Sequence, residues 1–196
     1  MSPVVTNNPR HEEMMGLATR ALDHFQNHTT DMAPEPMLMP VEAYTNQERY
    51  AAERERIFKN LPLALALSLE LPEAGDYKAM TVMETPIILC RNDQGRVKCF
   101  LNACRHRGAR LCEDGRSSSR VFACPYHAWT YDRDGSLIGR YAEETFGELD
   151  YSQYGLTELP CEERSGLIWV SLTPHAHFDL DEWLGDFAAE LDTLAL

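Results

Sequence analysis

The length and charge of this chain limit what it can be. Its 196 residues are enough for one domain with a hydrophobic core, and they are short for two full domains. The formal net charge of -13 argues against binding to nucleic acid or to an anionic membrane surface, because both attract proteins rich in Lys and Arg. A protein or a small molecule is therefore the expected kind of partner.

The N-terminal thirty residues contain charges and no continuous apolar run, so no secretory signal peptide is expected. We therefore expect a cytoplasmic protein. There the six cysteines should stay reduced, and metal binding is favoured over disulfide formation.

The N-terminal region is predicted to be helical and then extended. Apolar residues recur at helical spacing over residues 9–26, with Pro9 in the first turn. Three prolines between residues 29 and 41 predict an extended connection, which ends a first segment, 1–44. A second helix is predicted from Thr45 to Asn60, with Thr45 and Glu48 forming a capping box.

After residue 60 the apolar pattern changes to that of strands. Leucines alternate with smaller or polar residues from Leu63 to Leu71, and a hairpin is predicted with a turn at residues 92–95. The predicted strands are 63–71, 85–90, 97–101, 121–123, 128–131, 137–138 and 167–172. Residues 180–191 carry a helical apolar stripe. The pattern predicts a mainly β fold with flanking helices (α+β), built as a small antiparallel β-sandwich or barrel.

The residues that carry chemistry form two mixed pairs, Cys104 with His106 and Cys124 with His127. In a Rieske [2Fe–2S] centre, two thiolates hold one iron and two imidazoles hold the other. Each loop must then supply one ligand of each kind, as these pairs do. A zinc site usually pairs Cys with Cys and His with His, so a zinc-stabilised interaction module is a less favoured alternative.

The sequence resembles a known family around these pairs. The segments NACRHRG (102–108) and ACPYHAWTYDRDGSL (123–137) are similar to the Rieske domain of the α subunit of ring-hydroxylating, or Rieske non-haem iron, oxygenases. The resemblance includes LPEAGDY (71–77) and SGLIWVSL (165–172). It implies a Rieske-type antiparallel β-sandwich over residues 45–174, with Cys104, His106, Cys124 and His127 as ligands of a [2Fe–2S] cluster.

The resemblance also implies a function. The Rieske domain would accept electrons from a ferredoxin or flavin reductase and pass them to a mononuclear Fe(II). That iron would lie in a catalytic domain, or in a neighbouring α subunit, and would activate O₂ to oxidise an aromatic or other small organic substrate. Residues 175–196 resemble the start of this catalytic domain, which the sequence otherwise lacks, so no catalytic residue is assigned. A free-standing Rieske-type ferredoxin is the main alternative.

Two further features near the ligand pairs remain open. Trp129 occupies the position at which respiratory-chain Rieske proteins place a hydroxyl that bonds a cluster sulfur, so the resemblance implies a lower potential. Five arginines crowd the loops, at positions 105, 107, 110, 116 and 120. They form either a docking patch for an acidic electron donor or neighbouring subunit, or an ordinary solvated loop.

Two other histidine pairs could bind a metal. His24 and His28 are near Asp23 on the predicted first helix, and His175 and His177 precede Asp179. Solvated surface histidines are the favoured interpretation of both pairs.

Overall fold

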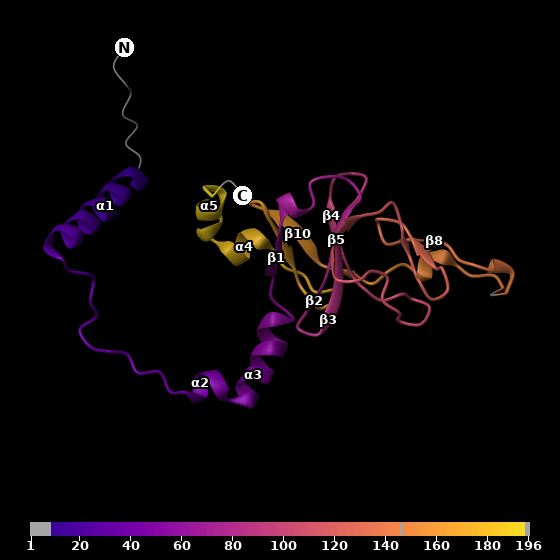
Figure 1. The fold of residues 1–196 in the computed structure, drawn as a ribbon, viewed down its shortest axis with the longest axis horizontal. Coiled ribbons are helices and arrows are strands. Elements are labelled where there is room, and N and C mark those ends of the chain that lie inside the picture. Colours follow the sequence, from indigo (N-terminus) through magenta and orange to yellow (C-terminus); the bar gives the residue numbers. More distant parts are fainter. Residues whose placement is uncertain (1–8, 146, 195–196) are drawn as a thin grey trace, which may run out of the picture. The chain divides into compact units, whose positions relative to one another are not determined.

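The computed structural model describes residues 9–145 and 147–194 (Figure 1). The chain divides into two compact units, Met1–Tyr44 and Thr45–Leu196. Within the described ranges, no helix is both long enough and apolar enough to cross a membrane.

The first unit consists of one long helix and an extended connection. Helix α1 (Pro9–Asn27) confirms the helix predicted over residues 9–26. Its C-terminal end is marked by His28, which has a positive φ of 54°. The proline-containing residues that follow have no regular structure up to residue 41, as predicted. Residues 1–8 of the predicted N-terminal segment lie outside the described residues.

A short helical segment precedes the sheets. It comprises α2 (Glu42–Thr45), α3 (Gln47–Glu53) and a π-helical turn, η1 (Arg54–Phe58). The prediction of one helix capped by Thr45 is wrong, because the cap of α3 is Asn46. Its side-chain oxygen accepts a hydrogen bond from the Arg49 N–H at 2.8 Å. Asn is a stronger N-cap than Thr, which accounts for the shift by one residue.

The described strands form three antiparallel sheets (Figure 1). The first sheet has the order β1 (Leu63–Leu67), β11 (Leu167–Val170), β10 (Cys161–Arg164). The central sheet has the order β5 (Gly115–Ser118), β2 (Asp76–Val82), β3 (Thr85–Arg91), β4 (Val97–Leu101), β9 (Glu158–Leu159). The small sheet has the order β6 (Phe122–Ala123), β7 (Thr130–Tyr131), β8 (Leu137–Gly139). Three short 3₁₀ turns connect strands: η2 (Ser68–Glu70), η3 (Glu143–Thr145) and η4 (Tyr151–Gln153). This architecture confirms the predicted mainly β, antiparallel class with flanking helices.

The central sheet separates two hydrophobic cores. Ile87 and Leu89 of β3 belong to the sandwich core, which also contains residues of β1 and β11. Ile88 and Cys90 point to the opposite face, into a loop core that contains Cys104 and Cys124. All four β3 side chains are fully buried. A strand with both faces buried therefore positions the Cys–His loops against the rest of the domain.

The predicted β3–β4 hairpin is confirmed, and its turn is built around one buried side chain. The side-chain oxygen of Asn92 accepts hydrogen bonds from the N–H groups of Gln94 and Arg96 at 3.1 and 2.9 Å. Its amide nitrogen donates to the Asp134 carboxylate at 2.7 Å. Asn92 thus connects this turn to the β7–β8 turn beside the second Cys–His loop.

The C-terminal tail differs from its prediction. Instead of one helix there are two, α4 (Leu180–Leu184) and α5 (Phe187–Asp192), because Gly185 interrupts them with a φ of 51°. Leu180 and Leu191 are buried in a small core around Trp169 of β11. Part of the apolar stripe thus covers the domain's own sheet. Residues 195–196 of the predicted segment lie outside the described residues.

Candidate metal centre

The first Cys–His loop, residues 104–109, is a closed backbone turn that follows β4. The Cys104 N–H donates to the Ala109 carbonyl at 2.8 Å, and the Gly108 N–H donates to the Cys104 carbonyl at 2.8 Å. Gly108 has a φ of 72°, in the left-handed region that glycine adopts at little cost. These bonds turn the chain tightly enough for Cys104 and His106 to lie on the same side of the loop.

The second Cys–His loop, residues 124–129, repeats this backbone pattern. The Cys124 N–H donates to the Trp129 carbonyl at 2.8 Å, and the Ala128 N–H donates to the Cys124 carbonyl at 2.9 Å. Ala128 occupies the position that corresponds to Gly108 and has a φ of 51°. The two loops are therefore structural equivalents, although they differ in sequence and in the spacing of Cys and His.

A buried asparagine holds the first loop in place. The Asn102 side-chain oxygen accepts hydrogen bonds from the N–H groups of Leu111 and Cys112, at 2.9 and 3.2 Å. Its amide nitrogen donates to the Cys112 carbonyl at 2.7 Å. Asn102 was not predicted from the sequence, although a polar side chain next to a ligand loop was a possible signal.

The two loops bring all four predicted site residues together. Cys104 and Cys124 are 3% and 4% exposed, whereas His106 and His127 are only partly buried. The two imidazole rings lie 4.8 Å apart between centroids. The site therefore has two sulfur donors on its inner side and two nitrogen donors toward the surface.

The ionisation of the side chains reflects this burial. Burial raises the pKa of the Cys104 thiol, and the hydrogen bond from Tyr131 opposes this effect. Burial, followed by the charges of His127 and Arg107, lowers the pKa of His106. A neutral imidazole is the form that binds a metal.

Aromatic rings surround the histidines. Trp129 is buried and stacks on His106, with the ring centroids 5.0 Å apart and an interplanar angle of 6°. Tyr126 lies against His127 at 3.8 Å between centroids and is 60% exposed. Trp129 therefore shields one imidazole from water, whereas Tyr126 contributes to the surface beside the other.

Tyr131, like Asn102, was not predicted from the sequence as part of this site. Its buried hydroxyl lies 3.3 Å from the Cys104 sulfur and accepts a hydrogen bond from the Arg105 N–H at 3.0 Å. Because a thiolate has no proton to donate, the hydroxyl donates to the Cys104 sulfur when that sulfur is ionised. Trp129 replaces a hydroxyl at its own position, but Tyr131 supplies one from two residues further on.

The donor set consists of two buried thiols and two partly buried imidazoles. The buried Nδ1 of His127 has no hydrogen-bond partner among the described residues. Two thiols and two imidazoles, with a ring nitrogen left for a metal, fit a [2Fe–2S] cluster better than a zinc ion.

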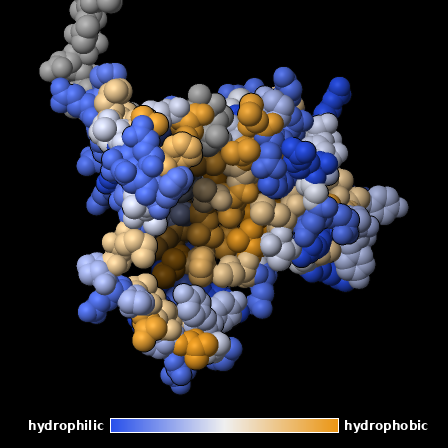
Figure 2. All heavy atoms as spheres, turned by 60° about the vertical axis from the view of Figure 1, so that its left-hand side comes forward, coloured by the Kyte–Doolittle hydropathy of each residue, from blue (hydrophilic) through white to orange (hydrophobic). Residues whose placement is uncertain are grey.

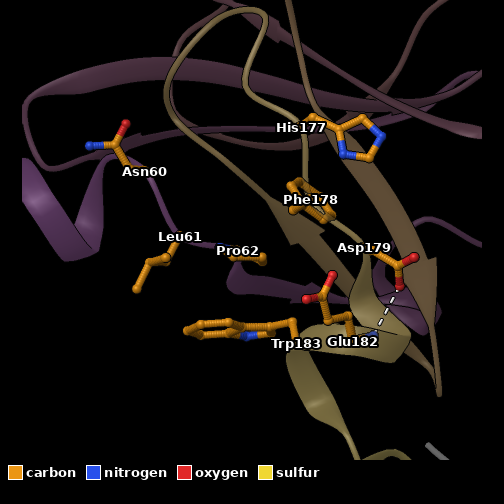
Figure 3. A pocket seen from close by; sticks show the side chains of 8 residues that line it. All are labelled: Asn60, Leu61, Pro62, His177, Phe178, Asp179, Glu182 and Trp183. Carbon is orange, nitrogen blue, oxygen red and sulfur yellow. Dashed lines mark hydrogen bonds between the residues drawn. The ribbon is translucent and has the colours of Figure 1, made fainter.

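The other histidine pairs make different contacts. His24 bonds to the Thr29 hydroxyl and to the Asp31 carboxylate, both at 2.9 Å. His175 lines a pocket beside Arg105, whereas His177 lines a separate pocket near Trp183 (Figure 3).

The five arginines of the loops also separate into different environments. Arg110 pairs with Asp114 at 3.2 Å, and Arg116 lies 4.0 Å from Glu70. Arg120 lines a different pocket, which Arg133 also lines. Arg105 and Arg107 directly flank His106 and are exposed.

Comparisons with known proteins agree with this geometry. Residues 62–153 match the Rieske [2Fe-2S] domain family. The glycine betaine monooxygenase oxygenase subunit of Chromohalobacter salexigens is 35% identical over 195 residues, which cover 94% of this chain and 42% of that protein. The chain thus spans less than half the length of this curated relative.

Solved structures give the same result. Naphthalene 1,2-dioxygenase from Rhodococcus sp., bound to indole, is 39% identical with a TM-score of 0.69 over 75% of this chain and 34% of that chain. A quaternary ammonium Rieske monooxygenase, whose structure reveals insights into inter-subunit electron transfer, is 28% identical with a TM-score of 0.71. The match covers 79% of this chain and 42% of that protein.

Proposed function

Because this chain carries a Rieske [2Fe-2S] domain and is homologous to the Rieske portion of Rieske oxygenase α subunits, we propose that its four site residues hold the cluster. Cys104 and Cys124 would bind one iron, and His106 and His127 the other. The buried thiols, the adjacent imidazoles and the orphaned Nδ1 of His127 support this assignment. When bound, the cluster supplies one-electron chemistry.

The surrounding residues have separate tasks in this proposal. Trp129 excludes water from one face of His106, and the Tyr131 hydroxyl stabilises negative charge on the Cys104 sulfur. His106 and His127 lie on the partly exposed side, where a partner protein has the shortest approach. The buried cysteines are kept away from solvent.

The chain would serve as the electron-transfer part of a ring-hydroxylating oxygenase α subunit in the cytoplasm. Electrons would come from a ferredoxin or flavin reductase and go to a mononuclear non-haem iron that activates O₂, in a catalytic domain or neighbouring α subunit. The inter-subunit electron transfer of the quaternary ammonium monooxygenase supports a neighbouring subunit as acceptor. The substrate would be an aromatic or other small organic compound bound by the catalytic domain.

A pocket near the C-terminal helices, lined by four apolar and four polar residues, supports a contact with such a domain. Figure 2 shows that apolar side chains are exposed among the polar ones in this view. Leu61, Pro62, Phe178 and Trp183 line a pocket of about 330 Å³, and Trp183 is 46% exposed (Figure 3). Exposed aromatic surface of this kind is typical of protein interfaces. In this proposal residues 45–174 form the Rieske domain, and residues 175–196 lead to the catalytic domain.

The first experiment is to measure iron, zinc and acid-labile sulfide in anaerobically purified protein. Two irons and two sulfides per chain are expected, and one zinc without sulfide would contradict the proposal. Cys104→Ser and His127→Ala should each lose the cluster. Cys112→Ser is the matched control, because Cys112 lies beside the same loop but is not a proposed ligand.

A second experiment separates the oxygenase part from a free-standing ferredoxin. The reduced chain alone should form no oxygenated product, and it should become reoxidised when a catalytic domain with a mononuclear iron is added. If the reduced chain instead donates only to soluble electron carriers, the ferredoxin alternative is favoured.

A further inference from the structure

The two arginines that flank His106 stand out in this acidic chain. Among the described residues, neither Arg105 nor Arg107 forms an ion pair with a carboxylate, although the sequence contains 31 Asp and Glu against 18 Lys and Arg. The nearby Arg110 is different, because Asp114 neutralises it at 3.2 Å. Uncompensated positive charge therefore lies next to one proposed ligand of the cluster.

A pocket lies beside the first of these arginines. It has a volume of about 540 Å³ and is lined by Arg105, Gly155, Leu156, Thr157, Glu158 and His175. A long hydrogen bond of 3.4 Å joins Arg105 to the Thr157 hydroxyl, so most of the guanidinium donors remain available. The Glu158 carboxylate is held by Lys98 at 2.6 Å. The pocket thus offers a guanidinium, a hydroxyl and an imidazole, which suit a carboxylate.

The second Cys–His loop supplies the rest of this surface. Pro125 and Tyr126 are exposed at its tip, and the ring of Tyr126 packs against His127. Arg and Tyr are enriched in protein interfaces, where Tyr provides apolar contact and Arg provides charge. The presence of both arginine and tyrosine on this surface therefore favours a protein partner over a small anion.

We propose that Arg105, Arg107 and Tyr126 form the docking surface for an acidic face of the electron-donor protein, one carboxylate of which enters the pocket beside Arg105. This inference rests on the proposed function. One electron leaves the donor and enters this chain, and no bond is formed or broken. Attraction between the arginines and the donor would orient its redox centre toward the two histidines.

The first test uses small charged oxidants on the anaerobically reduced, cluster-loaded protein. The rate of oxidation by the ferricyanide anion should fall as ionic strength rises, and the rate with the hexaammineruthenium(III) cation should not fall. A chain with a net charge of -13 and no local positive surface would give the opposite pattern. That opposite pattern would overturn the docking proposal and leave the cluster assignment intact.

A pair of double variants tests whether Arg105 and Arg107 cause this salt dependence of the oxidation rate. Arg105→Gln with Arg107→Gln should lower the low-salt ferricyanide rate by about tenfold and abolish its decrease with salt. The control is Arg56→Gln with Arg96→Gln, which removes the same charge at two other exposed arginines without carboxylate partners among the described residues. Equal effects of the two double variants would overturn the proposal.

A binding measurement that does not depend on electron transfer completes the test. A dye-labelled octaglutamate peptide should bind the protein at low salt, as measured by fluorescence anisotropy, and an octaglutamine peptide should not. The Arg105→Gln, Arg107→Gln protein should lose this binding, and the control variant should keep it. If the variant instead changes only the oligomeric state, the surface belongs to a neighbouring subunit and the proposal of a donor site fails.

Discussion

At the scale of single residues, the Tyr131 hydroxyl gives the clearest expected effect on the cluster. It lies 3.3 Å from the Cys104 sulfur, and a donor at this position stabilises the more negative, reduced state. Tyr131→Phe should therefore lower the reduction potential. A loss of about 1 kcal/mol of hydrogen bonding corresponds to about 40 mV for one electron.

A redox titration of the loaded protein measures this shift. Tyr154→Phe is the control, because its ring lies 5.7 Å from that of Trp129 between centroids and, among the described residues, no hydrogen bond joins its hydroxyl to either cysteine. Equal shifts in both variants would mean that loss of packing, and not loss of the hydroxyl, changes the potential.

The equivalent positions Gly108 and Ala128 allow a test of backbone strain. Both have a positive φ, which costs a non-glycine residue roughly 1–2 kcal/mol. Gly108→Ala should lower the free energy of unfolding by about 1 kcal/mol and keep the cluster, because no atom lies within 4 Å of the added Cβ. Ala128→Gly should leave stability unchanged or raise it slightly. Urea unfolding of the loaded protein measures both, and cluster loss in Gly108→Ala would contradict the equivalence of the loops.

At the scale of elements, an ion pair joins the central sheet to the first sheet. Arg91 of β3 donates to both carboxylate oxygens of Glu163 on β10, at 2.7 and 3.0 Å. The hydrogen bonds from Arg91 are the largest cause of the lowered pKa of Glu163. Glu163→Gln should lower the free energy of unfolding at neutral pH by about 1–2 kcal/mol.

The pH dependence of this difference has a definite sign. The folded-state pKa of Glu163 lies below its unfolded value, so the pair stabilises the protein fully above the unfolded pKa. The stabilisation is lost as pH falls through the folded pKa. Denaturant unfolding across this range should show the variant and the original protein converging at acidic pH. Glu162→Gln on the same strand is the control, because no ion pair joins Glu162 to another of the described residues.

The elements that the sequence predicted correctly are those with a clear apolar pattern. The β3–β4 hairpin combines buried alternation with a turn sequence, and α1 has helical periodicity. The strands β2, β5, β9 and β10 were not predicted. The residues of β5 and β10, GRSS and CEER, show no apolar alternation, and these edge strands are defined by backbone pairing instead of a buried side-chain face. The edge strand β9 has only two residues, and the inner strand β2, DYKAMTV, mixes polar and apolar residues on both of its faces.

The residues of the site likewise differ in whether neighbouring residues in the sequence are enough to predict them. The two Cys–His pairs are local motifs and could be read from the chain. The contact of Tyr131 with Cys104 depends on the fold, which brings β7 to the first Cys–His loop. The bonds of Asn102 to Leu111 and Cys112 depend on the conformation of that loop. The separation of Arg105 from the ion-paired Arg110 likewise required side-chain positions.

At the scale of the whole domain, the two cores predict an uneven response to loss of the metal. Cys104 and Cys124 belong to the loop core, whereas Leu89 and Ile168 belong to the sandwich core on the other face of the central sheet. A bound cluster would cross-link two loops of the loop core only. Removal of iron should therefore loosen the small sheet and both Cys–His loops and leave the sandwich core folded.

Hydrogen exchange of the loaded and iron-free proteins measures this difference. Backbone amides of β6, β7 and β8 should lose protection in the iron-free protein, and those of β3 and β11 should keep it. We expect β3 and β11 to keep their protection because Ile87, Leu89 and Ile168 in the sandwich core are fully buried without any contribution from the metal site. Equal loss of protection in both groups would mean that the domain unfolds as one cooperative unit. The cluster would then stabilise the whole sandwich through the shared strand β3, and not only the loops that hold it.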